Sequence, residues 1–194
     1  MATLKSLLTG SLLALTMACG TALAVPTTYH VDLTTVPFAS EGSGYLELSL
    51  SGPGSAAPVT AMVGNLTGTD TGDYLFGAAQ ATGGDSYAFY TPDSALWKAV
   101  TFGGMLGFDV TFDIGDGGSD INYFTVAFLN QADYLTGPVV QFDLSAGAAP
   151  VVTGSDIALV TLVDQQGEVP EPADWAMLLT GLGLMGFTLR RRQR

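Results

Sequence analysis

Hydrophobic and polar residues alternate with a period of two along most of the middle of this chain. In the clearest run, Leu106, Phe108, Val110, Phe112 and Ile114 alternate with glycine, aspartate and threonine. Side chains of a strand point alternately to opposite faces, so this pattern predicts a strand with one buried and one solvated face. Similar runs, separated by Gly, Asp, Ser and Pro clusters, lie at residues 29–33, 45–50, 59–63, 87–90, 123–129, 139–144 and 157–163. We therefore predict an all-β fold, an antiparallel β-sandwich or jelly roll of about eight to ten strands.

The aromatic residues divide between the core and other uses. Phe108, Phe112, Phe124 and Phe128 lie in the alternating runs and are expected in the core. Residues 95–100 are interpreted as a helical turn with Trp97 packing inward. If Trp97 and several of the seven tyrosines were instead exposed on one face, they could form a platform on which sugar rings stack.

The N-terminus has the three parts of a secretory signal peptide: Lys5, an apolar stretch at residues 7–17, and the small residues Ala22 and Ala24 around Leu23. Cleavage after Ala24 is expected. This step would remove residues 1–24, including the only cysteine, Cys19, so we expect no disulfide in the mature protein.

The C-terminus has an uncharged apolar stretch at residues 175–189, followed by four arginines. As a helix it would be about 22 Å long, which is short for the roughly 30 Å hydrocarbon core of a bilayer. Trp175 suits one membrane interface, and the arginines suit the cytoplasmic one. We therefore predict one short transmembrane helix with the C-terminus in the cytoplasm. A buried C-terminal helix is the alternative, although it does not explain the clustered arginines.

The C-terminal segment contains Val169-Pro170-Glu171-Pro172, then Trp175-Ala176, an apolar stretch and an arginine cluster. Together these features resemble a PEP-CTERM sorting signal of the PEPxxWA variety. The resemblance implies a Gram-negative bacterium that makes exopolysaccharide, and recognition by an exosortase, a membrane-embedded cysteine transpeptidase. It further implies that the inner membrane holds the chain only transiently, before cleavage near Pro170-Glu171-Pro172 releases it to the cell surface, a biofilm matrix or the medium. The implied sorting residues are Val169, Pro170, Glu171, Pro172, Trp175, Arg190, Arg191 and Arg192.

The chain therefore divides into a signal peptide (1–24), an extracellular domain (25–168) and a sorting segment (169–194). The domain itself resembles a family of PEP-CTERM exoproteins of unassigned function. That likeness rests on residues 29–33, 44–48, 77–80 and 102–112, and it implies no catalytic residue.

The charge of the domain limits its partners. Of the 18 acidic residues, only Glu171 and Asp174 lie outside residues 25–168, and Lys98 is the sole lysine or arginine within them. The domain thus has a net charge of about −15. Nucleic acid is excluded as a partner, because phosphate binding needs a basic surface.

Catalytic chemistry has little support in the sequence. The mature chain has no cysteine and one histidine, His30, which alternation places with Asp32 on a solvated strand face, opposite Tyr29, Val31 and Leu33. Asp109 and Asp113 share a face, but about 13 Å apart, beyond the carboxylate spacing of about 5 to 9.5 Å in glycosidases. A catalytic pair of carboxylates on two different strands is an alternative that the sequence leaves undecided.

The loop at residues 113–120 is the best candidate for a bound ion. Asp113, Asp116 and Asp120, with loop carbonyls, can supply several of the six to eight oxygens that Ca²⁺ takes. A hairpin loop rich in turn-forming residues explains the same composition without an ion. We expect no other cofactor.

These features favour a non-enzymatic surface or matrix protein, associated with exopolysaccharide. Two alternatives stay open. One is a secreted polysaccharide hydrolase with paired carboxylates, and the other is a calcium-assisted, lectin-like module.

Overall fold

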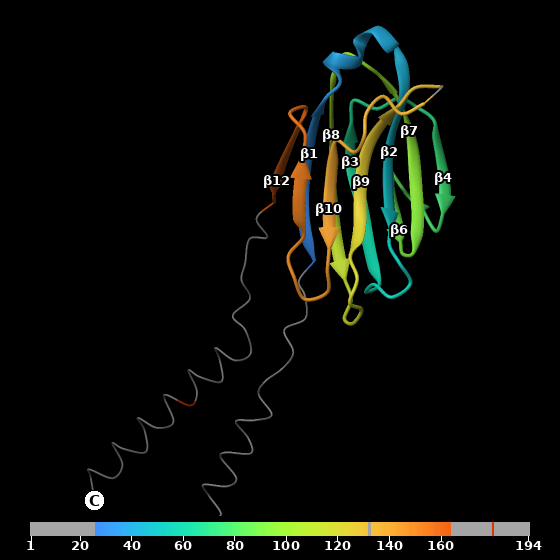
Figure 1. The fold of residues 1–194 in the computed structure, drawn as a ribbon. Coiled ribbons are helices and arrows are strands. Elements are labelled where there is room, and N and C mark those ends of the chain that lie inside the picture. Colours follow the sequence, from blue (N-terminus) through green and yellow to red (C-terminus); the bar gives the residue numbers. More distant parts are fainter. Residues whose placement is uncertain (1–25, 132, 164–179, 181–194) are drawn as a thin grey trace, which may run out of the picture. The chain divides into compact units, whose positions relative to one another are not determined.

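The computed structural model describes residues 26–131, 133–163 and Thr180. Among these residues, the strands form two antiparallel sheets of six strands each. The first sheet, sheet A, has the strand order β12-β1-β8-β3-β6-β5. The second, sheet B, has the order β11-β10-β9-β2-β7-β4. The sheets lie face to face (Figure 1), so the prediction of an all-β sandwich is confirmed.

The strand bounds follow. Sheet A contains β1 (Thr27–Thr34), β3 (Val59–Thr67), β5 (Gln80–Gly83), β6 (Ser86–Tyr90), β8 (Met105–Ile114) and β12 (Ala158–Leu162). Sheet B contains β2 (Ser43–Ser51), β4 (Asp73–Gly77), β7 (Asp93–Thr101), β9 (Asn122–Leu129), β10 (Val140–Leu144) and β11 (Val151–Gly154). A short 3-10 helix, η1 (Val36–Glu41), connects β1 to β2.

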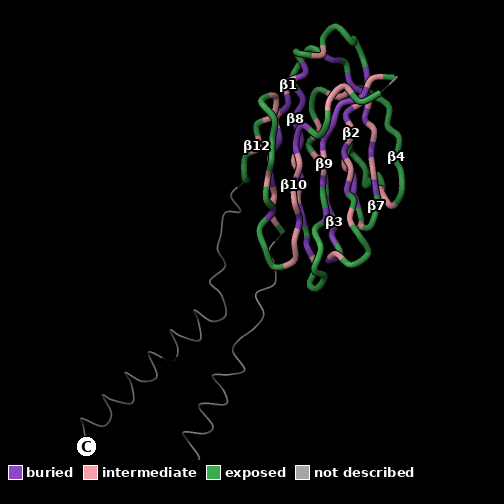
Figure 2. The backbone as a smooth tube through the Cα atoms, in the orientation of Figure 1, coloured by how far each residue is buried: buried purple, intermediate pink, exposed green. Residues whose placement is uncertain are grey.

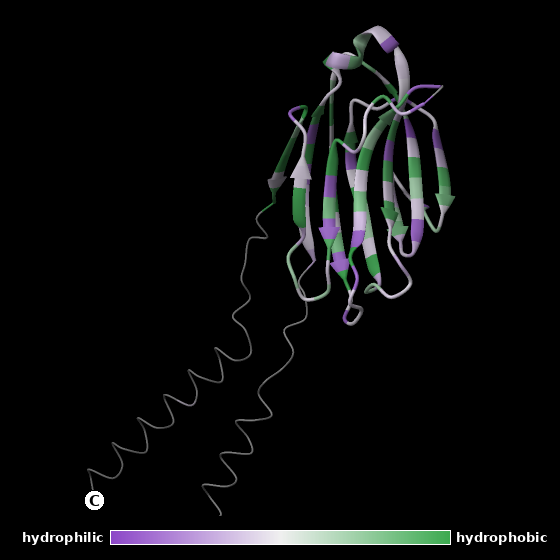
Figure 3. Ribbon diagram, viewed as in Figure 1, coloured by the Kyte–Doolittle hydropathy of each residue, from purple (hydrophilic) through white to green (hydrophobic). Residues whose placement is uncertain are grey.

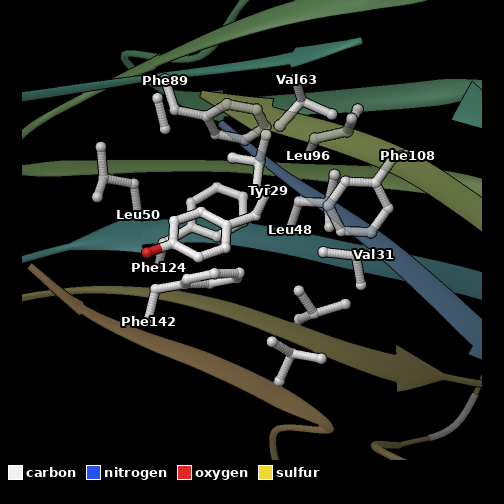
Figure 4. Packing of buried hydrophobic residues seen from close by; sticks show 14 of the residues in the cluster. Tyr29, Val31, Leu48, Leu50, Val63, Phe89, Leu96, Phe108, Phe124 and Phe142 are labelled. Carbon is white, nitrogen blue, oxygen red and sulfur yellow. The ribbon is translucent and has the colours of Figure 1, made fainter. Parts of the chain in front are cut away.

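Alternation along the strands produces the core between the sheets. In β2, Leu46, Leu48 and Leu50 are fully buried while the residues between them are partly exposed. The same alternation of buried and more exposed positions recurs along the other central strands (Figure 2) and follows their hydropathy (Figure 3). Rings from both sheets meet in this core: the ring centroid of Phe89 in β6 lies 5.6 Å from that of Phe124 in β9 (Figure 4). The four phenylalanines expected in the core, 108, 112, 124 and 128, are all buried there.

The interpretation of residues 95–100 as a helical turn with Trp97 inside is wrong. These residues belong to β7, whose Ser94, Leu96, Lys98 and Val100 face inward. Trp97 therefore points outward. Two inward positions of β7 are occupied by polar residues, which masks the alternation that would reveal a strand.

Each of the eight predicted runs overlaps a strand, but the structure has four more than the sequence revealed. Besides β7, these are β4, β5 and β11. All three are edge strands, and every residue of β4 and β5 is exposed. An edge strand with no buried side chain has no hydrophobic alternation to detect.

The predicted signal peptide and, apart from Thr180, the predicted membrane helix lie outside the described residues. Within residues 26–131 and 133–163, no helix has the length and hydrophobicity needed to cross a bilayer.

Lys98 links the two sheets near their β4 and β5 edges. Its side chain starts from β7 of sheet B and is only 4% exposed as a residue. Its ammonium donates hydrogen bonds to the Asp85 carboxylate (3.0 Å) and to the Tyr87 hydroxyl (3.3 Å), both on the sheet A side. Tyr87 in turn donates to Asp73 of β4 at 2.9 Å. Burial disfavours the charged amine, but the bonds to Asp85 and Tyr87 outweigh it and raise the pKa of Lys98.

The Lys98–Asp85 pair should contribute measurably to stability. Asp85→Asn leaves the buried ammonium without its anion, and the free energy of unfolding should fall by about 1–2 kcal/mol, a modest value because the Asp85 side chain is 65% exposed. In a Lys98→Met background the same change should cost roughly 0.3 kcal/mol or less, because no charge remains to be neutralised. Urea unfolding of the four proteins measures this coupling, and an equal cost in both backgrounds would contradict it.

Candidate functional site

The outer face of sheet B carries four neighbouring aromatic side chains from three adjacent strands. Tyr45 comes from β2, Trp97 from β7, and Tyr74 and Phe76 from β4. We call this set the aromatic platform. Trp97 lies at its centre, with ring-centroid distances of 4.9 Å to Phe76 and 6.0 Å to Tyr45, and Tyr45 lies 5.9 Å from Tyr74. Tyr74 and Phe76 are 55% and 44% exposed, so the platform is open to solvent.

A hollow of about 580 Å³ lies on the same face beside the platform. Glu47 of β2 joins the two features, because it lines the hollow and is also the cross-strand partner of Trp97. The hollow is lined by Glu47, Ser49, Thr125, Ala127, Asp133, Tyr134, Thr136, Gly137 and Pro138. A hydrogen bond from the Tyr134 hydroxyl to the Glu47 carboxylate, with a smaller contribution from burial, raises the pKa of Tyr134 to about 12. Tyr134 is therefore a neutral donor at physiological pH, and Glu47 accepts its proton in a hydrogen bond.

The sequence indicated that aromatic residues exposed on one face could form a sugar-stacking platform, but it did not identify which residues these would be. It named Trp97 and the tyrosines, and the structure brings Trp97 together with Tyr45 and Tyr74. Phe76 could not be identified, because β4 shows no alternation. Tyr87 is buried and Tyr90 lies on β6 of sheet A. Tyr123 is exposed on β9 of sheet B, opposite Ser51 at the end of β2, and Tyr134 contributes to the hollow.

The outer face of sheet A holds a second polar cluster, centred on His30. Its Nδ1 lies 2.6 Å from Asp109 Oδ1, and its Nε2 lies 3.3 Å from Asp32 Oδ1. Asn65 donates to the other oxygen of Asp109 at 2.6 Å. His30 and Asp32 are partly exposed, whereas Tyr29, Val31 and Leu33 are buried, which confirms the predicted solvated face.

The His30 cluster is an ion-pair network on a sheet surface. The hydrogen bond to Asp109 is the main cause of the raised pKa of His30; partial burial opposes it and the Asp32 charge adds to it. Burial would raise the pKa of Asp109, but the bonds from Asn65 and His30 lower it overall. Both imidazole nitrogens face carboxylates, so the ring is held in place by acids on either side. A shallow hollow of about 360 Å³ beside Asp109 and Asn65 completes this surface.

The structure does not gather Asp113, Asp116 and Asp120 into an ion site. In the described parts of the chain, no three His, Cys, Asp or Glu side chains are arranged to hold a metal ion. The loop is also not a hairpin, because it connects β8 of sheet A to β9 of sheet B.

This loop packs against the connection between β2 and β3. Asp120 accepts a hydrogen bond from the Ser55 hydroxyl, and Ser119 N donates to Ser55 O at 3.3 Å. Gly118 has φ +78° and lies so close to the chain that a Cβ would be 2.3 Å from Ala57 N. The close approach of the two loops explains why a glycine occupies position 118.

The sorting residues Val169, Pro170, Glu171, Pro172, Trp175, Arg190, Arg191 and Arg192 lie outside the described residues, as do the signal-cleavage residues Ala22 and Ala24. Comparison with protein families nevertheless identifies the tail. Residues 168–192 match the PEP-CTERM protein-sorting motif. No curated protein and no solved structure matches the chain.

These results define a class of protein: a β-sandwich with a C-terminal sorting signal, directed to the cell surface or beyond it. More narrowly, the chain carries the PEP-CTERM motif that the sequence predicted, which marks it for an exosortase. The match covers the tail alone, so the resemblance of residues 25–168 to an exoprotein family stays a prediction.

The His30 cluster should make stability depend on pH in one direction. Its raised pKa means that protonated His30 stabilises the folded state below the ordinary value of 6.5, and that this contribution is lost as pH rises through the higher folded-state value. Thermal melts between about pH 5.5 and 8.5 should show a decline for the wild type. The decline should be smaller in His30→Gln, and an unchanged pH profile in that variant would show that the cluster does not couple to folding.

Proposed function

We propose that this chain is an exosortase-processed surface or extracellular-matrix protein whose sandwich domain associates with exopolysaccharide and has no catalytic role. The observation that carries the proposal is the PEP-CTERM motif at residues 168–192, attached to a domain with an exposed aromatic platform. The tail delivers the domain, and the platform gives it a surface suited to sugar rings.

The chemistry of the tail suits a temporary hold followed by cleavage. Pro170 and Pro172 disfavour helix at the residues before them and favour an extended segment that an enzyme can reach. The apolar stretch at residues 175–189 is at the lower limit for spanning a bilayer. Arg190, Arg191 and Arg192 would hold its end on the cytoplasmic side. The domain would thus lie outside the inner membrane when Pro170-Glu171-Pro172 is cut.

Altering the tail should change the size and location of the protein. Replacement of Pro170, Glu171 and Pro172 by alanine should leave an uncleaved, heavier form in the membrane fraction, because the processing segment is lost. Deletion of residues 190–194 should also reduce cleavage, because the cytoplasmic anchor is lost. Immunoblots of membrane, surface and medium fractions from the exopolysaccharide-producing host measure both effects.

A variant with lysine at positions 190, 191, 192 and 194 is the matched control, since it keeps the positive charge. Processing of this lysine variant should resemble that of the wild type more closely than processing of the deletion variant does. Normal cleavage and location in both the alanine and the deletion variants would overturn the sorting role.

One observation favours a second candidate, a polysaccharide hydrolase. Glu47 and Asp133 line the same hollow, together with Tyr134. Hydrolysis of a glycosidic bond needs two carboxylic groups on either side of the scissile bond. Glu47 comes from β2 and Asp133 from the loop between β9 and β10, so this pair differs from the cross-strand pair that the sequence left open.

Assays of reducing-end release separate the two candidates. A non-catalytic protein releases nothing from the host exopolysaccharide. A hydrolase releases oligosaccharides, and Glu47→Gln and Asp133→Asn should each slow it by about 100-fold or more. Asp93→Asn, an exposed aspartate outside the hollow, is the control. Release that survives both hollow variants would exclude this pair as the catalytic residues.

A further inference from the structure

We propose that the aromatic platform and the hollow beside it form one binding site for an uncharged polysaccharide. This inference rests on the proposed association with exopolysaccharide, and it specifies both the surface and the class of sugar. Three features of the molecule support it: the exposure of the rings, the polar groups next to them, and the distribution of charge.

The exposed rings are not part of the core. The sandwich already has a complete aromatic core in which Phe89, Phe112, Phe124 and Phe142 pack together between the sheets. Tyr74 and Phe76 lie outside it on an edge strand, and exposed apolar side chains that adjoin one another, unlike scattered ones, are typical of interaction surfaces. Their ring contacts with Tyr45 and Trp97 hold them in a continuous row across β2, β7 and β4.

The row of rings adjoins groups that bind hydroxyls. A pyranose ring has an apolar C–H face and a rim of hydroxyl groups, so it needs the flat face of one aromatic ring beside hydrogen-bonding partners. Glu47, opposite Trp97 in the strand register, supplies an acceptor, and Tyr134, Ser49 and Thr125 supply hydroxyls. The volume of the hollow lies within the range of about 300–1,000 Å³ that is usual for small-ligand sites.

The charges exclude an anionic polymer. Lys98 is the sole lysine or arginine of residues 25–168, and its ammonium is buried and bound to Asp85 and Tyr87. Carboxylate or sulfate groups on a polysaccharide would therefore meet Glu47 and Asp133 without a compensating cation. An uncharged glycan has no such repulsion. A cationic glycan would be attracted to acidic residues over the whole surface, and its binding would depend on salt rather than on the platform.

Affinity electrophoresis of the processed protein, recovered from the surface fraction or medium of its host, tests the proposal. Native gels would contain an uncharged β-glucan, an uncharged α-glucan, an uncharged galactomannan, alginate or chitosan. At least one of the uncharged gels should retard the protein, and alginate should not. Trp97→Ala and Tyr74→Ala should each weaken that retardation by about tenfold.

Two further variants make the result specific. Tyr90→Ala removes an aromatic ring of similar exposure (37%) from sheet A and should leave retardation unchanged. Trp97→Phe keeps a ring and should retain more binding than Trp97→Ala. Tyr74→Ala also separates a loss of binding from a loss of folding. Tyr74 lies on an edge strand and its side chain is largely exposed, so the fold should survive its removal.

Four outcomes would overturn the inference. These are no retardation in any uncharged gel, equal retardation of the platform variants and the wild type, binding to chitosan alone that vanishes at high salt, and platform-dependent dimerisation in sedimentation experiments. The last would make the platform a protein–protein interface. If the platform variants still co-purify with the host matrix, this site is wrong but the proposed function stands; if the wild type does not co-purify, the proposed function itself fails.

Discussion

Contact between the aromatic inner faces of the two sheets determines most of what the molecule presents to solvent. Phe112 of sheet A packs against Phe124 and Phe142 of sheet B, with ring centroids 5.4 and 5.0 Å away. Because side chains alternate along a strand, each residue fixed in this layer also fixes the direction of its neighbours. In sheet B the inward position of Leu96 places Trp97 outside, and the inward positions of Leu46 and Leu48 place Glu47 outside. Packing in the core therefore determines which side chains lie on the outer face of sheet B.

The distribution of charge follows a different constraint. The domain has one lysine, and the fold uses it internally, where it neutralises Asp85 and completes a chain of hydrogen bonds that joins the sheets. The surface is left with carboxylates, neutral groups and His30. Such a surface repels anionic polymers, so recognition of an uncharged ligand must come from ring stacking and hydrogen bonds rather than from charge attraction.

The sequence predicted the strands whose side chains alternate strictly, because alternation is itself the physical cause of a two-faced strand. It missed β7 because Ser94 and Lys98 occupy inward positions, and it missed β4 because an exposed edge strand buries nothing. The candidate site was harder to predict from the sequence for a related reason. Tyr45, Tyr74 and Trp97 are distant in sequence, and only strand register brings them together. His30 was placed correctly because its position depends on one strand alone. Its partner Asp109 required knowledge that β1 and β8 are neighbours.

The pairing of β1 with β12 has a consequence for export. Tyr29 of β1 lies opposite Leu162 of β12, and Val163 N donates to Thr28 O at 2.9 Å. A chain that crosses the membrane from its N-terminus therefore cannot complete sheet A until residues 158–162 have also crossed. The sorting motif begins at residue 168, only a few positions later. In a chain exported from its N-terminus, completion of the fold and arrival of the sorting signal at the membrane would therefore nearly coincide.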